Sequence, residues 1–160
     1  MSVSTDAILF FGFLLEEDGD PYPWEDEKYD GSEEWFVEVL GVEFPDQDWD
    51  SLTKTEQEQV WDEYRQVKRK ALKSSEIELI QHCSGSHPMY AIGIKKTTKT
   101  AWRGYPAHID PNLAVQVGWI EDLKKFSRVL NLEPEIYDPE KHKKDITGKL
   151  GWWLVSYWGQ

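Results

Sequence analysis

The stretch that decides the fold lies near the N-terminus and reads AILFFGFLL, from Ala7 to Leu15. Asp6 precedes this stretch and acidic residues follow it directly, so the apolar run ends in charge on both sides. A short run that is apolar on both alternating faces and rich in Phe is typical of a strand buried in the middle of a sheet. We therefore predict a central strand over residues 7–15.

The C-terminal residues 151–159 have the same character and read GWWLVSYWG. We predict that both faces of each strand are buried. Two such strands are most easily accommodated side by side, so we also predict that the N- and C-terminal strands are neighbours at the centre of one sheet. Two further strands are predicted over residues 76–82 and 89–95. The Ser, Gly and Pro residues between them are typical of a hairpin loop, which makes the predicted sheet mostly antiparallel.

Two helices are predicted to pack on this sheet. The first covers about residues 56–73, where Thr55 and Glu58 fit a capping box and apolar residues then recur at helical spacing. The second covers about residues 119–130, which carry one apolar stripe. Strands and helices that are segregated along the chain in this way predict the α+β class.

Length and composition predict one domain over residues 1–160. Hydrophobic residues make up 39% of the chain and nine residues are Trp, which is enough for a core without disulfides. The single Cys excludes an intrachain disulfide framework. No segment resembles a secretory signal or a membrane-spanning helix, so we expect a protein of the reducing, cytoplasmic compartment.

Negative charge is concentrated in an acidic segment, residues 16–50. This segment holds 15 of the 30 acidic residues and one basic residue, Lys28, whereas the whole chain has a formal net charge of −12. Such a balance argues against direct binding to nucleic acid or to a membrane surface. Aromatic residues are interleaved with the carboxylates: Tyr22, Trp24, Tyr29, Trp35, Phe36, Phe44 and Trp49.

Aromatic anchors among carboxylates are typical of a surface that binds a basic protein. We predict that six residues form this partner-binding site: Trp24, Glu25, Asp26, Glu27, Glu33 and Glu34. Their carboxylates could occupy a groove lined by Lys and Arg by copying the charge of a nucleic-acid backbone. In the alternative interpretation, residues around Trp35 form core structure and the acidic residues only solvate it.

Two other groups of residues could carry chemistry. Trp102, Arg103 and Tyr105 place a cation among aromatics, which can stack a base and hold a phosphate, with His82 as a further ligand-binding residue; the same grouping can also be cation–π packing. The loop from His82 to His87 contains Cys83, so it could bind zinc or supply a nucleophile and a base, or it could be a plain structural turn. We assign no catalytic residue, metal ligand or cofactor.

Three parts of the chain, taken together, resemble a family of uncharacterised bacteriophage proteins. They are the N-terminal MSVSTDAIL followed by Gly12, the central HCS and PMY at residues 82–84 and 88–90, and the C-terminal residues 151–159. The acidic segment lies largely outside this resemblance. The family has no assigned activity, so the resemblance implies only an origin, namely a phage accessory protein in the cytoplasm of a bacterial host.

These features predict a non-enzymatic anti-defence or host-takeover inhibitor, such as an anti-CRISPR protein, whose acidic and aromatic surface binds a basic groove of a host protein. Two alternatives remain open. One is a protein that binds a small ligand such as a nucleotide at Trp102, Arg103 and Tyr105. The other is a small hydrolase that uses the loop from His82 to His87.

Overall fold

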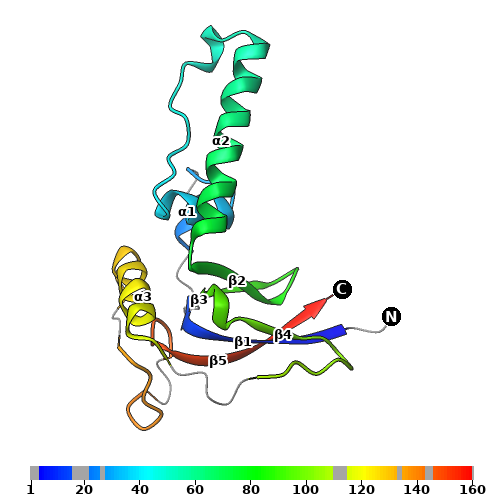
Figure 1. Ribbon diagram of the computed structural model, residues 1–160, viewed down its shortest axis with the longest axis vertical. Coiled ribbons are helices and arrows are strands. Elements are labelled where there is room, and N and C mark those ends of the chain that lie inside the picture. The colour runs from blue at the N-terminus through cyan, green and yellow to red at the C-terminus, as the bar shows by residue number, and fades with distance from the viewer. Residues whose placement is uncertain are drawn as a thin grey trace. The chain divides into compact units, whose positions relative to one another are not determined.

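The computed structural model describes residues 4–15, 22–25, 28–109, 115–132, 135–142 and 146–159 (Figure 1). In chain order the described elements, with η for a 3-10 helix, are β1 (Ser4–Leu14), η1 (Pro23–Glu25), α1 (Ser32–Val39), η2 (Trp49–Ser51), α2 (Lys54–Ser74), β2 (Ile77–Ser84), β3 (Pro88–Ile94), η3 (Lys95–Thr97), β4 (Lys99–Ala101), α3 (Val117–Val129) and β5 (Gly151–Gly159). The fold is α+β, as predicted. None of the helices in these ranges is long and apolar enough to cross a membrane.

The chain divides into two compact units. One unit, the sheet unit, comprises Met1–Tyr22 and Glu76–Gln160, and the other, the helical unit, comprises Pro23–Ser75. The acidic segment, residues 16–50, contributes to both. A division into compact units does not by itself make two domains, so the single domain over residues 1–160 stays a prediction.

The five strands form one sheet in the order β3-β2-β5-β1-β4. The N- and C-terminal strands β1 and β5 are antiparallel neighbours, in register from Ser4 opposite Gly159 to Gly12 opposite Gly151 (Figure 1). The predicted pairing of the two terminal strands is therefore confirmed. The predicted hairpin of β2 and β3 is confirmed as well, with Ile77 opposite Ile94 and Cys83 opposite Pro88.

An additional pairing between β1 and β3 closes four of the strands into a ring. Each of β3, β2, β5 and β1 pairs with the next, and β1 pairs again with β3. The β2–β5 contact is parallel and begins at Cys83, whose φ of 70° turns the end of β2 toward β5. Side chains from the ring strands form one hydrophobic cluster, comprising Phe10, Leu14, Ile80 and Ala91 with Ile8, Ile146, Trp153 and Val155 packed against them.

The edge of β1 that faces away from β5 is shared between two strands. β4 pairs with residues 7–9 and β3 pairs with residues 12–14. Between these ladders the buried Thr97 Oγ1 accepts a hydrogen bond from the Phe11 backbone N–H at 2.9 Å and donates one to the Ile94 carbonyl at 2.7 Å. The Thr97 side chain thus pairs with the Phe11 N–H of β1, which lies between the residues of β1 that pair with β4 and those that pair with β3.

The two terminal strands differ in burial. Both faces of β1 are buried from Phe10 to Leu14, as predicted, whereas residues 7–9 are half-buried; Phe10 and Phe13 are fully inaccessible. The prediction of two buried faces is wrong for β5, where alternate residues stay accessible: Leu154 is 70% exposed and Trp158 is 55% exposed. Apolar character on both faces of a strand does not ensure burial, because another element must also cover each face.

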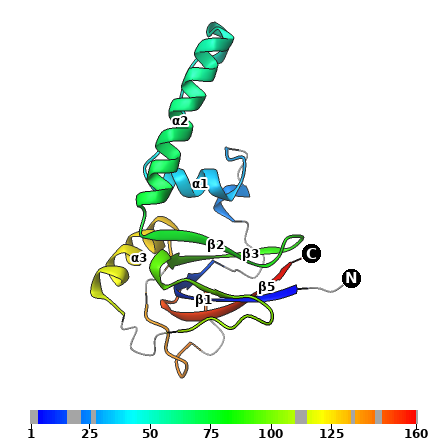
Figure 2. The same ribbon diagram turned by 45° about the vertical axis from the view of Figure 1, so that its right-hand side comes forward.

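Helix α3 packs on the sheet, and its Trp119 ring lies 6.3 Å from the Phe11 ring of β1 (Figure 2).

Within the helical unit, the cap of α2 lies two residues before the predicted capping box. The Thr53 hydroxyl accepts a hydrogen bond from the Glu56 backbone N–H, and the Glu56 carboxylate accepts one from the Thr53 backbone N–H. The cap is therefore Thr53 and not the predicted Thr55. The Gln57 side chain donates hydrogen bonds to the Trp49 and Leu52 carbonyls, which ties the first turn of α2 to the residues before it.

Candidate functional site

The predicted partner-binding residues have different environments in the helical unit. Trp24 is only 7% exposed and its ring lies 5.0 Å from that of Trp35, so the Trp24 indole is part of the packing. Glu25 is exposed. Glu33 and Glu34 occupy the first turn of α1, where carboxylates interact favourably with the helix dipole. The remaining two, Asp26 and Glu27, lie outside the described residues.

The alternative interpretation, in which the aromatic residues form core structure, holds for part of the acidic segment. Trp35, Phe36 and Val37 of α1 are buried. The Lys68 ammonium of α2 lies 2.8 Å from the Glu33 carboxylate, an ion pair that joins α2 to α1. The aromatic surface available to a partner therefore has to come from other residues.

Phe44 and Trp61 provide such a surface. Phe44 is 43% exposed, Trp61 is 37% exposed, and their rings lie 5.3 Å apart in an edge-to-face arrangement. Trp49 stacks on Trp61 with 5.5 Å between ring centroids, and its ring also lies 6.2 Å from that of Phe44. Trp61 was not among the predicted site residues because it lies on α2, outside the acidic segment. The signal that could have found it is its three-residue spacing from Tyr64, which places both rings on one helix face.

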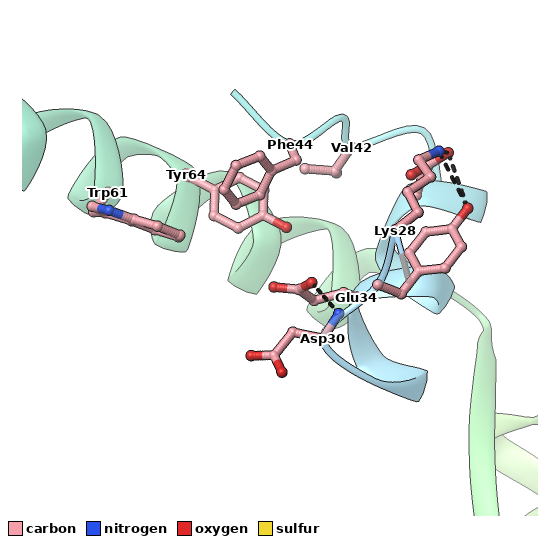
Figure 3. Close-up of a pocket in the computed structure, with 9 residues that line it drawn as sticks. Lys28, Asp30, Glu34, Val42, Phe44, Trp61 and Tyr64 are labelled. Atoms are coloured by element: carbon pink, nitrogen blue, oxygen red, sulfur yellow. Dashed lines mark hydrogen bonds and ion pairs between the residues drawn. The ribbon is translucent and has the colours of Figure 1, made fainter. Parts of the chain in front are cut away.

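A pocket of 510 Å³ lies beside these rings (Figure 3). Its volume is within the range of about 300–1,000 Å³ that is usual for ligand sites. Phe44, Trp61 and Tyr64 form an aromatic wall, and Figure 3 shows the carboxylates of Asp30 and Glu34 apart from it. The lining residues are Lys28, Tyr29, Asp30, Glu34, Glu38, Val42, Phe44, Trp61 and Tyr64.

One carboxylate of the pocket is neutralised from within the protein. The Lys28 ammonium forms an ion pair with Glu38, and Tyr29 donates its hydroxyl hydrogen bond to the same Glu38 oxygen at 3.3 Å. The same ammonium lies 4.9 Å from the centre of the Tyr29 ring. The hydrogen bond with Glu38, followed by that with Tyr29, raises the pKa of Lys28, so Lys28 is charged at neutral pH.

The other two carboxylates of the pocket belong to Asp30 and Glu34. Glu34 accepts a hydrogen bond from the Asp30 backbone N–H at 2.9 Å, but neither Asp30 nor Glu34 forms an ion pair with a described basic residue. Burial raises the pKa of the Tyr64 phenol, against the opposing effect of Lys68, and the phenol is neutral at neutral pH. Lys68 interacts electrostatically with Glu34 without forming an ion pair with it. The pocket therefore combines an aromatic wall with two carboxylates that form no ion pair with a described basic residue.

The alternative ligand-binding residues lie in the sheet unit. Trp102 and Tyr105 flank a tight turn after β4 and are 62% and 76% exposed. Gly104 adopts a φ of 80° within this turn, and the Arg103 backbone N–H donates to the buried Asp6 carboxylate at 3.4 Å. His82 is buried on β2, and β5 and β1 separate β2 from β4 in the strand order.

The loop from His82 to His87 joins β2 to β3. The Ser84 hydroxyl accepts a hydrogen bond from the His87 backbone N–H at 3.0 Å, which closes the turn. His82 is buried, whereas His87 is exposed. Within the ranges that the structure describes, no three His, Cys, Asp or Glu side chains are grouped so that they could hold a metal ion.

Comparison of the chain with protein-family models, with curated proteins and with solved structures finds no match in any of the three. The resemblance to bacteriophage proteins therefore stays a prediction, and the candidate site rests on its own geometry.

Proposed function

We propose that the helical unit is a binding surface for a basic protein. Residues 23–75 contain fifteen acidic and seven basic residues, a net charge of −8. Eleven of those acidic residues lie in residues 23–50, together with Lys28 as the one basic residue. The observation that carries the proposal is the pocket itself, which is lined both by exposed aromatic rings and by the carboxylates of Asp30 and Glu34.

Charge and aromatic surface have separate tasks in this proposal. A field of one sign attracts a basic partner over a distance and increases the rate of association. Partly buried aromatic rings supply apolar contact area and slow dissociation, as anchors do at most interfaces. Phe44 and Trp61 are the anchors in this proposal, in place of Trp24, whose indole is already buried against Trp35.

The resemblance to bacteriophage proteins extends this proposal to a biological role. The partner would be a host protein with a basic groove, and occupation of that groove by carboxylates would exclude nucleic acid from it. The chain would then act as an anti-defence or host-takeover inhibitor without an enzymatic step.

Charge reversal at two places tests the binding proposal. One variant carries Glu25→Lys and Glu33→Lys in the helical unit, and the matched control carries Glu121→Lys and Glu140→Lys in the sheet unit; all four residues are exposed. Both variants change the net charge equally. The association rate of a labelled oligolysine peptide is measured by stopped-flow fluorescence at low salt and at about 0.15 M salt, where the Debye length is about 8 Å.

The first variant should bind the peptide more slowly than the control, and the difference should shrink as salt rises. Exposed charges contribute little to stability, so circular dichroism should show both variants folded. Equal losses in the two variants would mean that only the total charge attracts the peptide. That result would contradict a binding surface located in the helical unit.

A further inference from the structure

We infer that the pocket beside Phe44 and Trp61 binds one arginine side chain of the basic partner. The inference rests on the proposed function, because it assumes that the helical unit meets a basic protein, and it adds which residue type is recognised. The partner is thus predicted to present an arginine that projects from its surface, rather than a diffuse field of positive charge.

The lining of the pocket selects the charge of its occupant. Asp30 and Glu34 repel an anion, and a neutral apolar group would remove water from both carboxylates without replacing it. A cation with an apolar stem fits both the rings and the carboxylates. Its stem packs on the rings of Phe44 and Trp61, and its charged end contacts the carboxylates. The side chains of Lys and Arg have this form.

One end of the pocket already contains a cation that is bound by a ring and a carboxylate of the protein itself. The Lys28 ammonium lies over the Tyr29 ring and contacts the Glu38 carboxylate, which combines a cation–π contact with an ion pair. Asp30, Glu34 and Trp61 offer the same two components, a carboxylate and a ring, and neither carboxylate forms an ion pair with a described basic residue. The Lys28 arrangement is therefore an internal example of the contact that we infer for the partner.

The geometry favours arginine over lysine. The guanidinium is planar, stacks on aromatic faces and donates several hydrogen bonds in a fork that matches carboxylates. Trp61 presents a large ring that is stacked on Trp49, so the Trp61 plane is held in place. A lysine ammonium is a strongly hydrated point charge and gains less from a flat ring.

The test compares labelled oligoarginine and oligolysine peptides of equal length by fluorescence anisotropy. Long-range attraction treats the two peptides alike, so the ratio of their dissociation constants reports the local pocket. Two pocket variants are measured: Trp61→Leu, which keeps apolar bulk but removes the ring, and Asp30→Asn with Glu34→Gln, which removes charge at constant shape. The matched control carries Glu43→Gln and Asp46→Asn, two exposed residues of the same unit outside the pocket lining.

Wild type should bind oligoarginine about tenfold more tightly than oligolysine, and the control should keep this ratio although both affinities fall. Each pocket variant should bring the ratio close to one. If both peptides bind but the pocket variants keep the arginine preference, or wild type has none, the arginine inference is wrong and the proposed function stands. If neither peptide binds wild type even at low salt, the proposed function fails and the inference fails with it.

Discussion

Replacing Gly12 with alanine should prevent the ring of strands from closing. Gly12 lies opposite Gly93 where β1 pairs with β3. A Cβ atom at residue 12 would lie 1.9 Å from the Ile92 carbonyl oxygen and 2.8 Å from the Gly93 Cα. Ordinary contact begins at 3.4 Å, so the Ile92 peptide would have to move by about 1.5 Å. Both obstructing atoms are backbone, so no side-chain rotation can relieve the clash.

The expected loss of stability follows from the two consequences of that movement. Overpacking of a close-packed interior costs about 1–3 kcal/mol. Displacing the Ile92 peptide also breaks the pairing at its neighbours Phe13 and Ala91, and each buried polar group left without a partner costs about 1–3 kcal/mol. One overpacked contact and two unpaired groups together cost about 3–9 kcal/mol, a large part of the roughly 5–15 kcal/mol that stabilises a typical domain.

Urea denaturation followed by Trp fluorescence measures this loss, and two other glycines provide the comparison. A Cβ at Gly93 would lie 2.6 Å from the Ile80 Cδ1, the end of a flexible side chain, so Gly93→Ala should cost about 1–3 kcal/mol. Gly118 is helical with nothing within 4 Å, so Gly118→Ala should stabilise by about 0.5–1 kcal/mol. A Gly12→Ala protein whose unfolding free energy is within 1 kcal/mol of wild type would refute the closed ring.

Two further predictions concern buried polar groups of the sheet unit. Thr97→Val should lower the unfolding free energy in urea by about 1–3 kcal/mol, because it leaves the buried Phe11 N–H without an acceptor, whereas Thr97→Ser should retain most of the stability; equal losses in the two variants would contradict this role of the hydroxyl. Burial raises the pKa of the Glu78 carboxyl above its usual 4.5, against the opposing effects of the Thr98 hydrogen bond and the Lys95 charge. Ionisation of Glu78 therefore destabilises the fold as pH rises past that value. Glu78→Gln should therefore have a higher melting temperature than wild type at pH 7, and the difference should disappear below about pH 4; a Gln variant less stable than wild type at pH 7 would contradict this.

Local patterns in the sequence predicted the elements of this protein well. The structure confirms the strands predicted from the two apolar runs and the hairpin predicted between β2 and β3. The same holds for the two main helices, to within two residues at each end. Each of these elements is set by residues that are close together in the sequence. The capping box of α2 is Thr53 with Glu56, two residues before the predicted Thr55 with Glu58.

Only the tertiary structure decided which side chains are available for binding. Trp24 and Trp61 are the same residue type, yet Trp24 is buried against Trp35 while Trp61 forms the wall of an open pocket. Leu154 is as apolar as Leu14, but Leu14 lies in the core cluster and Leu154 is 70% exposed. The periodicity of apolar residues shows which side chains share a face of a helix or strand. Burial depends on which faces pack together, and contacts between segments far apart in the chain set this packing.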